Sequence, residues 1–274
     1  MTTLALQADR WTFDGTDLSS YSVLVKSVGE AEDLPSLRGD DVGVPNLPGR
    51  RWAPKLPDSR RFALALHVSD MNAAGGLTEA TAARQAQKNL DDLRTLFARP
   101  GLRSLVHVMP DGSSRTAQAE VVSVTVDPSR GGRQMFVLLV DFSLPDPYFY
   151  GTSVVDSARS IAASPTDFTF THPGTVRTNR VTFDFVGPIA NPRVTQQTTG
   201  IYVECLVTVA STKHLIVDCE KFTALNDGVL AIGSIRHSGD FRWMILEPGA
   251  QTLRVTATSP GGTLTTTGFA PYHA

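Results

Sequence analysis

FSLPDPYFYG, residues Phe142 to Gly151, is the stretch that decides how this chain is organised. A strand-like apolar run, Met135 to Phe142, leads into it. Proline has no backbone N–H to donate and holds the residue before it extended, so β-pairing should stop at about Leu144. The aromatic residues Tyr148, Phe149 and Tyr150 should pin the segment onto an apolar surface. The stretch therefore predicts a domain boundary.

The bulk composition indicates a globular protein. The 274 residues are long for one hydrophobic core and sufficient for two. A hydrophobic content of 41% with 19% charged residues is ordinary for a folded chain, and the low charge with 17 prolines favours β structure. The formal net charge of −2 argues against nucleic-acid recognition.

Several chemical functions lack the residues that they need. No apolar run approaches the roughly 20 residues that span a bilayer, so membrane insertion is not expected, and the first ten residues lack the features of a secretion signal. Cys205 and Cys219 are expected to be buried free thiols rather than a disulfide or metal site. The histidines lack metal-ligand spacing, and no nucleophile elbow or phosphate loop occurs. We expect no enzyme activity and no cofactor.

The first half reads as a β-rich domain with one amphipathic helix. The helix, about residues 78–98, should start at Thr78 as N-cap, with Leu77 placed for a hydrophobic staple, and end at Arg99-Pro100-Gly101. Its apolar stripe is predicted to contain Ala83, Ala86, Leu90, Leu93 and Phe97. Strands are expected at 10–14, 21–28, 61–68, 105–109, 116–126 and 134–142, with turns at 110–112 and 128–132.

Residues 36–61 differ from the rest of this half. They are rich in proline and glycine, have almost no periodicity, and are predicted to form an extended arm or long loop. Two interpretations stay open for the basic residues of this stretch: a solvated charge run, or a contact with the acidic surface of a neighbouring subunit. These residues are Arg50, Arg51, Lys55, Arg60 and Arg61. Ordering such an arm costs roughly 1–2 kcal/mol per residue, which favours a partner that offsets the cost.

The second half indicates a β-sandwich. A polar linker should follow Gly151 to about Thr171, and short strand candidates then alternate with Gly, Pro, Asn and Asp turns without a helical period. The expected strands are 179–185, 191–195, 200–210, 214–218, 229–235, 241–246, 251–258 and 263–271.

Four motifs in order resemble the distal tail proteins of long-tailed, siphovirus-type bacteriophages. They are the junction Asp146-Pro147-Tyr148-Phe149-Tyr150-Gly151, the arm sequence 44–51, the sandwich opening 187–194, and the strand pair 214–218 with 246–253. Gln251 stands where the family often has Asn, and Arg51-Trp52 replaces a small residue. The resemblance covers nearly the whole chain.

The resemblance implies a structural protein of the virion tail tip, folded and assembled in the host bacterial cytoplasm. An N-terminal ring-forming α+β domain, residues 1–151, would carry the arm, and residues 152–274 would form a galectin-like β-sandwich. The homo-oligomeric ring, expected to be a hexamer, would join the tail tube protein and tape measure protein to baseplate or tail-fibre proteins. The arm residues that would contact a neighbouring subunit are Arg38, Arg50, Arg51, Trp52 and Lys55.

Two other classes of function remain. A carbohydrate-binding module could use Tyr202 and Trp243 to stack on a sugar of cell-wall glycan, although such aromatics more often fill a core. A glycan hydrolase would need a pair of acidic residues, and none is recognisable.

Overall fold

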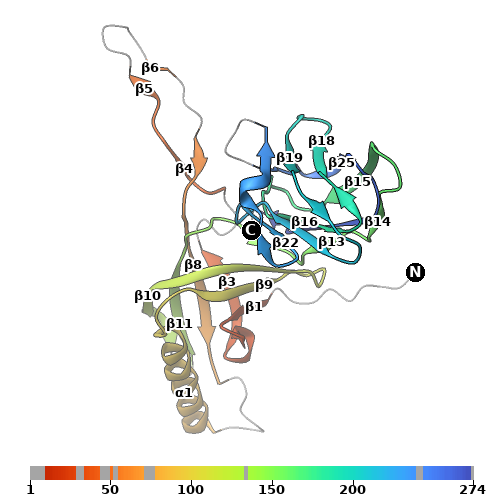
Figure 1. The fold of residues 1–274 in the computed structure, drawn as a ribbon. Helices are drawn as coiled ribbons and strands as arrows, with labels where there is room; N and C mark the ends of the chain where they lie inside the picture. The colour runs from red at the N-terminus through yellow and green to blue at the C-terminus, as the bar shows by residue number, and fades with distance from the viewer. Residues whose placement is uncertain are drawn as a thin grey trace, which may run out of the picture. The chain divides into compact units, whose positions relative to one another are not determined.

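A computed structural model describes residues 10–28, 34–43, 50–51, 55–70, 78–132, 135–238 and 243–272 (Figure 1). The chain divides into two compact units, of which unit 1 runs to Phe149 and unit 2 spans Tyr150–Tyr272. The described residues are mostly β-strands and contain one α-helix. A β-rich chain with a single helix is what the sequence predicted.

Unit 1 is built on an antiparallel sheet whose strands follow in the order β2-β1-β9-β10-β11-β8-β3. The strands are β1 (Arg10–Phe13), β2 (Thr16–Asp17), β3 (Ser22–Val28), β8 (Arg60–Val68), β9 (Arg103–Val108), β10 (Ser114–Gly132) and β11 (Met135–Leu144). A 3-10 turn, η1 (Leu18–Ser20), joins β2 to β3, with the Asp17 carboxylate accepting from the Ser19 N–H.

The long strand β10 pairs with both β9 and β11. Its first part, Ser114–Ala119, pairs with β9, and from Glu120 onwards it pairs with β11. The predicted turn at 128–132 is wrong, because β10 continues to Gly132, which pairs with Met135. The register is interrupted between Asp127 and Gly132, so Pro128 lies where the ladder does not require its missing N–H.

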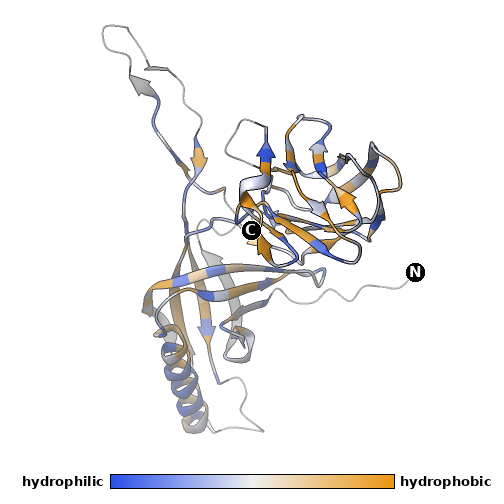
Figure 2. Cartoon of the chain, viewed as in Figure 1, coloured by the Kyte–Doolittle hydropathy of each residue, from blue (hydrophilic) through white to orange (hydrophobic). Residues whose placement is uncertain are grey.

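Strand β11 confirms the prediction that β-pairing stops at about Leu144. It pairs with β8 along its whole length, ending at Leu144 opposite Arg60, and the pairing stops one residue before Pro145. Both strands place large apolar side chains in one core (Figure 2).

The helix α1 (Glu79–Phe97) begins as predicted. The Thr78 hydroxyl accepts from the Thr81 N–H at 3.4 Å, whereas Leu77 lies outside the described residues. The apolar stripe begins at Ala82 rather than Ala83, which is half-buried. Asn89 is also buried in this face, and its amide donates to the Ser69 carbonyl at 2.8 Å. The helix buries this stripe in the core of unit 1.

Unit 2 is a β-sandwich, because two antiparallel sheets share one apolar core. One sheet runs β13-β26-β16-β21-β22-β23, with β14 also on β26; the other runs β15-β25-β18-β19-β24. The first sheet comprises β13 (Val154–Val155), β14 (Arg159–Ser160), β16 (Val181–Val186), β21 (His214–Asp218), β22 (Thr223–Asn226), β23 (Val229–Leu230) and β26 (Thr263–Gly268). The second comprises β15 (Thr166–His172), β18 (Arg193–Gln196), β19 (Tyr202–Cys205), β24 (Ile235–His237) and β25 (Gly249–Thr256).

Several predicted strands of unit 2 are corrected. The supposed linker before Thr171 contains β15, and the strand expected at 200–210 divides into β19 and β20 (Thr208–Val209), of which β20 pairs with β17 (Ile189–Ala190). Residues 229–235 divide into β23, the 3-10 turn η2 (Ile232–Ser234) and the start of β24. In the described part of 241–246, Leu246 forms an isolated bridge with Thr178, and Phe241 lies outside the described residues.

Candidate assembly surfaces

The predicted arm is a two-stranded ribbon that projects from the sheet of unit 1 (Figure 1). Strand β4 (Leu37–Arg38) pairs with β7 (Leu56–Pro57), and β5 (Val42–Gly43) pairs with β6 (Arg50–Arg51). The Asp58 N–H donates to the Ser36 carbonyl at 2.7 Å and closes the base of the ribbon. The sequence predicted an extended arm or a long loop, and the structure adds the four short strands that the sequence did not predict.

Both faces of the ribbon base carry exposed leucines. Directly opposite residues of an antiparallel pair point to the same face, so Leu37 shares one face with Pro57 and Leu56 shares the other with Arg38. Leu37 is 62% exposed and Leu56 is 43% exposed. The ribbon thus offers apolar side chains in two directions and has no core of its own to bury them.

Among the described side chains, the basic residues of the arm have different surroundings. Arg38 is exposed, and the Lys55 ammonium lies 3.8 Å from an Asp41 carboxylate oxygen. Arg50 and Arg51 are placed on β6 by their backbone, and Trp52 lies outside the described residues. Arg60, which the sequence reading counted among the basic contact residues, is 1% exposed because it opens β8 opposite Leu144, so it is not available to a neighbour's surface.

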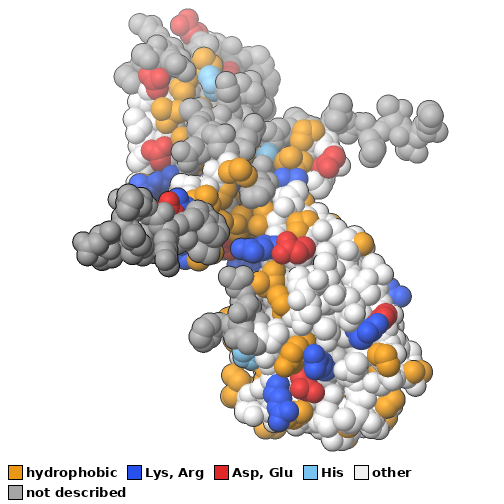
Figure 3. All heavy atoms as spheres, turned by 90° about the horizontal axis from the view of Figure 1, so that it is seen from above, with side chains coloured by type: hydrophobic (Ala, Val, Ile, Leu, Met, Phe, Trp, Pro, Cys, Tyr) orange, Lys and Arg blue, Asp and Glu red, His pale blue; other side chains and the backbone are white. Residues whose placement is uncertain are grey.

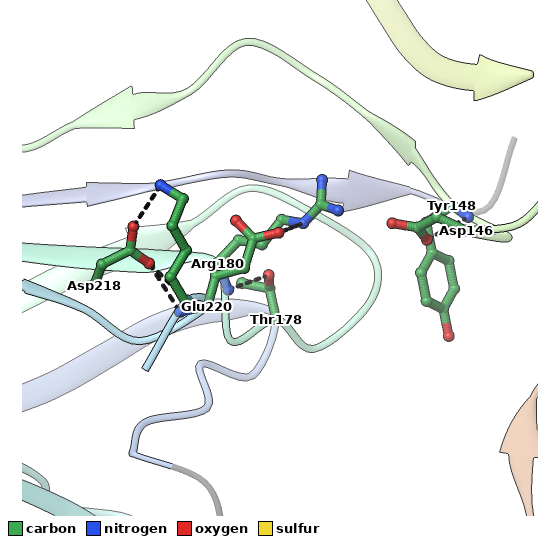
Figure 4. A network of polar contacts seen from close by, with 7 residues as sticks. Asp146, Tyr148, Thr178, Arg180, Asp218 and Glu220 are labelled. Carbon is green, nitrogen blue, oxygen red and sulfur yellow. Dashed lines mark hydrogen bonds and ion pairs between the residues drawn. The ribbon is translucent and has the colours of Figure 1, made fainter. Parts of the chain in front are cut away.

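At the junction, Phe149 belongs to the core of unit 1. Its side chain is fully buried, with ring centroids 6.1 Å from Trp11 and 6.3 Å from Phe62. Pro147 is also buried, and the Asp146 carboxylate accepts from the Tyr148 N–H at 3.2 Å, which turns the chain before Phe149 (Figure 4). Tyr148 and Tyr150 are half-buried, so the predicted burial of the three aromatics is confirmed.

Tyr150 opens unit 2 and is held there by a polar network. The Arg180 guanidinium lies 3.9 Å from the centre of the Tyr150 ring, a cation–π distance. Arg180 is itself oriented by Glu220, at 2.7 Å, and its N–H donates to the Thr178 hydroxyl at 3.0 Å (Figure 4). The tyrosine ring is therefore fixed by a charge that other side chains position.

Gly151 has a packing reason to be glycine. Its N–H donates to the Ala270 carbonyl at 3.0 Å, and a Cβ at this position would lie 2.8 Å from Cε2 of the Tyr272 ring. A larger residue would push that ring away. The Tyr-Gly pair of the junction motif thus reflects one cation–π contact and one close approach, neither of which the sequence could show.

The aromatic residues and cysteines that were considered for sugar binding, disulfide formation or metal binding are part of the structure of unit 2. Trp243 is buried, and one face of Tyr202 is covered by the Arg193 guanidinium 3.6 Å from the ring centre, so these two aromatics form no joint platform for a sugar. Burial raises the pKa of the Cys205 thiol to about 12 and that of Cys219 well above its usual value. Within the described ranges no group of His, Cys, Asp and Glu could hold a metal ion.

One buried histidine was not singled out by the sequence. His172 ends β15, and its Nδ1 accepts from the Gly174 N–H at 2.8 Å. Its side chain is 2% exposed, and burial lowers the pKa of the imidazole below its usual value. The signal available in the sequence was alternation along Phe168, Phe170 and His172, which places all three on one face of a strand.

The chain thus consists of two β-rich units, and the first carries a projecting ribbon with exposed leucines. Residues 173–271 match the family model for the C-terminal domain of the siphovirus-type tail component. This match agrees with the resemblance found in the sequence, and it identifies residues 173–271 as a tail-component C-terminal domain of the siphovirus type.

Solved structures agree on the fold. The crystal structure of SPP1 Dit (gp 19.1), described as a paradigm of the hub adsorption apparatus in phages that infect Gram-positive bacteria, has a TM-score of 0.65 at 18% identity, covering 96% of this chain and 99% of that one. The phage P2 baseplate in its activated conformation with Ca matches at a TM-score of 0.40 and 10% identity, over 96% and 98% of the two chains, which is too low to support an argument. No curated protein sequence matches the chain.

Among the described residues, no helix has the length and apolar character needed to cross a bilayer.

Proposed function

We propose that this chain is the hub of the phage tail tip and assembles into a closed ring of six copies. The ring would join the tail tube protein and the tape measure protein to baseplate or tail-fibre proteins. Its role is structural rather than catalytic, and assembly would take place in the host cytoplasm before the tail is complete.

The observation that carries the proposal is the ribbon with leucines on both faces. Leu37 and Leu56 point in opposite directions from the same short ladder, so a flat partner surface could cover one face but not both. A neighbouring copy that encloses the ribbon would bury both, and each copy would then donate one ribbon and receive another. Such head-to-tail contacts generate a ring when the rotation closes.

The family supplies the second support. The match of residues 173–271 to the tail-component domain supports a location in the virion tail, and the fold of the chain is similar to that of SPP1 Dit over 96% of its length. The sandwich of unit 2 is proposed to be the galectin-like domain, residues 152–274, and unit 1 the ring-forming domain, residues 1–151.

The test is the mass of the full-length protein in solution, by light scattering over a range of concentrations, followed by negative-stain imaging. We expect a species of six chains that images as a ring, and the same ring at the tip of purified tails. A monomer at every concentration, with no ring in tails, would contradict the proposal. A monomer that shifts on soluble glycan would favour the carbohydrate-binding alternative instead.

A further inference from the structure

One edge of the sandwich is unusually apolar. Strand β23 ends the first sheet, and among the described strands it has β22 as its one neighbour. Asp227 and Gly228 join the two strands with φ values of 49° and 79°, which is the backbone of a tight hairpin turn. We use the term "apolar edge" for the exposed residues Ile216, Val229, Leu230 and Ile232 together with Leu225.

Three residues of the apolar edge form a continuous row. Ile216 on β21 lies opposite Leu225 on β22, which in turn lies opposite Leu230 on β23. Residues paired in this way project from the same face, and in β21 that face is the outer one, since Leu215 and Val217 point into the core. Leu230, at the end of the row, is 60% exposed.

The backbone of Leu230 is directed toward the open side. In an antiparallel ladder, residues alternate between facing their partner strand and facing away from it. The Ala231 N–H donates to the Ala224 carbonyl at 2.8 Å, so residue 231 faces β22 and its predecessor faces away. The N–H and the carbonyl of Leu230 therefore point to the open side of β23, and its exposed side chain lies at the end of the apolar row. This is the geometry to which a further strand can add.

The charges around the apolar edge are neutralised within the chain. The Lys213 ammonium lies 2.7 Å from the Asp227 carboxylate, and Lys221 lies 2.8 Å from Asp218. Glu220 is paired with Arg180 at 2.7 Å. Figure 3 shows that blue and red side chains also lie next to one another on one face of unit 2. No unbalanced charge among these residues would attract a charged partner.

The opposite edge of the same sheet offers a comparison. Strand β13 ends that side, and its Val155 is also 60% exposed. There the next residue is Asp156, whose carboxylate makes two hydrogen bonds with Arg159 at 3.0 and 3.1 Å. Charged side chains beside an edge discourage the addition of a strand. At the β23 edge the ion pair of Asp227 with Lys213 lies at the turn before the strand, and the residues that follow Leu230, from Ala231 to Ser234, are uncharged.

We propose that the apolar edge is a docking site for an extended, uncharged segment of another tail protein, which adds to β23 as a short strand. The backbone of the added segment would form hydrogen bonds with the backbone of Leu230. Its apolar side chains would extend the row of Ile216, Leu225 and Leu230. The inference rests on the proposed function, since it requires the chain to sit in a tail. It adds a second contact surface, on unit 2, to the ribbon of unit 1.

The experiment places a photoreactive benzoylphenylalanine at position 230 of the full-length chain, and at position 155 as the matched control, in phage tails assembled with each variant. We expect light to cross-link position 230, but not 155, to a different tail protein. A cross-link to a second copy of this chain, a cross-link within the chain, no cross-link, or equal yields at the two positions would each overturn the inference.

Substitution gives an independent readout. Leu230→Lys should leave the melting of the sandwich unchanged, because the side chain is exposed, and should remove the docked protein from purified tails; Val155→Lys should not. Retention of every tail protein in the Leu230→Lys particles would contradict the inference while leaving the ring proposal intact. Absence of the wild-type chain from purified tails would contradict both.

Discussion

At the scale of single residues, Phe149 shows why the junction motif is aromatic. The ring is fully buried against Trp11 and Phe62, so the last residue of unit 1 is also part of its core. Deleting such a ring removes its transfer free energy and leaves a cavity. The end of unit 1 is therefore held to its core by the last side chain of the unit.

Phe149→Ala should lower the free energy of unfolding of unit 1 by about 3 kcal/mol. The measurement is a denaturant titration of the full-length variant. Phe269→Ala is the matched control, because that ring is 43% exposed and the same atoms are removed. Equal effects of the two substitutions would mean that Phe149 is not a core residue.

His172 should make the sandwich sensitive to mild acid. Burial lowers the pKa of the folded-state imidazole, so the unfolded chain binds the proton more readily. Stability is then complete above the unfolded-state pKa of about 6.5 and falls as the pH drops below it, by at most about 1.4 kcal/mol per pH unit, until the folded-state value is passed.

The measurement is the melting temperature of unit 2 at several pH values between 7.5 and 5. His172→Gln keeps an acceptor for the Gly174 N–H but cannot titrate, so this variant should melt with a smaller pH dependence than the wild type. An unchanged pH dependence would assign the effect to other groups.

At the scale of elements, the sequence predicted best where a local rule acts alone. The N-cap at Thr78 and the end of β11 at Leu144 each follow from one local constraint, a hydroxyl acceptor and a proline. By contrast, Trp243, Met244 and Leu246 read as a strand because they are apolar, yet they cover the core with a single bridge at Leu246. Apolar residues in a sequence indicate that a segment is buried, but they do not indicate whether its backbone is paired in a sheet.

The strands of the ribbon were not predicted, because their residues are not typical of a strand. Its paired residues, such as Leu37 with Pro57, have neither strand composition nor alternation, and the two ladders are only two residues long on each side. Likewise, Arg60 read as a surface charge because its neighbours in sequence are polar, whereas its place at the start of β8 buries it. The contact residues of the arm could be proposed from composition, but their accessibility required the fold.

Removing the ribbon should separate assembly from folding. Deletion of residues 41–57 removes β5, β6 and β7, and none of the described core residues of unit 1 lies in this range, so both units should keep their cooperative melting while the ring is lost. The double substitution Leu37→Ser with Leu56→Ser should have the same effect without shortening the chain, and Leu102→Ser, at another exposed leucine, is its control. Rings formed by the deletion variant would exclude the ribbon as the assembly element.

At the scale of the whole molecule, the two units have separate cores, and the boundary between them falls between Phe149 and Tyr150. Each of these neighbouring residues is held by its own unit: Phe149 by aromatic rings of unit 1, and Tyr150 by Arg180 of unit 2. One aromatic segment thus anchors both units. Because the two core clusters share no residue, we expect each unit to fold by itself.

The two surfaces proposed for assembly also divide between the units. The ribbon belongs to unit 1 and the apolar edge to unit 2, so a fragment of residues 1–149 should form the ring and a fragment of residues 150–274 should be a folded monomer. Light scattering and thermal melting of the two fragments, compared with the full-length chain, test this division. If fragment 150–274 formed the ring and fragment 1–149 stayed monomeric, the ribbon would lose its role and ring closure would have to be sought on the sandwich, with the apolar edge as the first surface to examine.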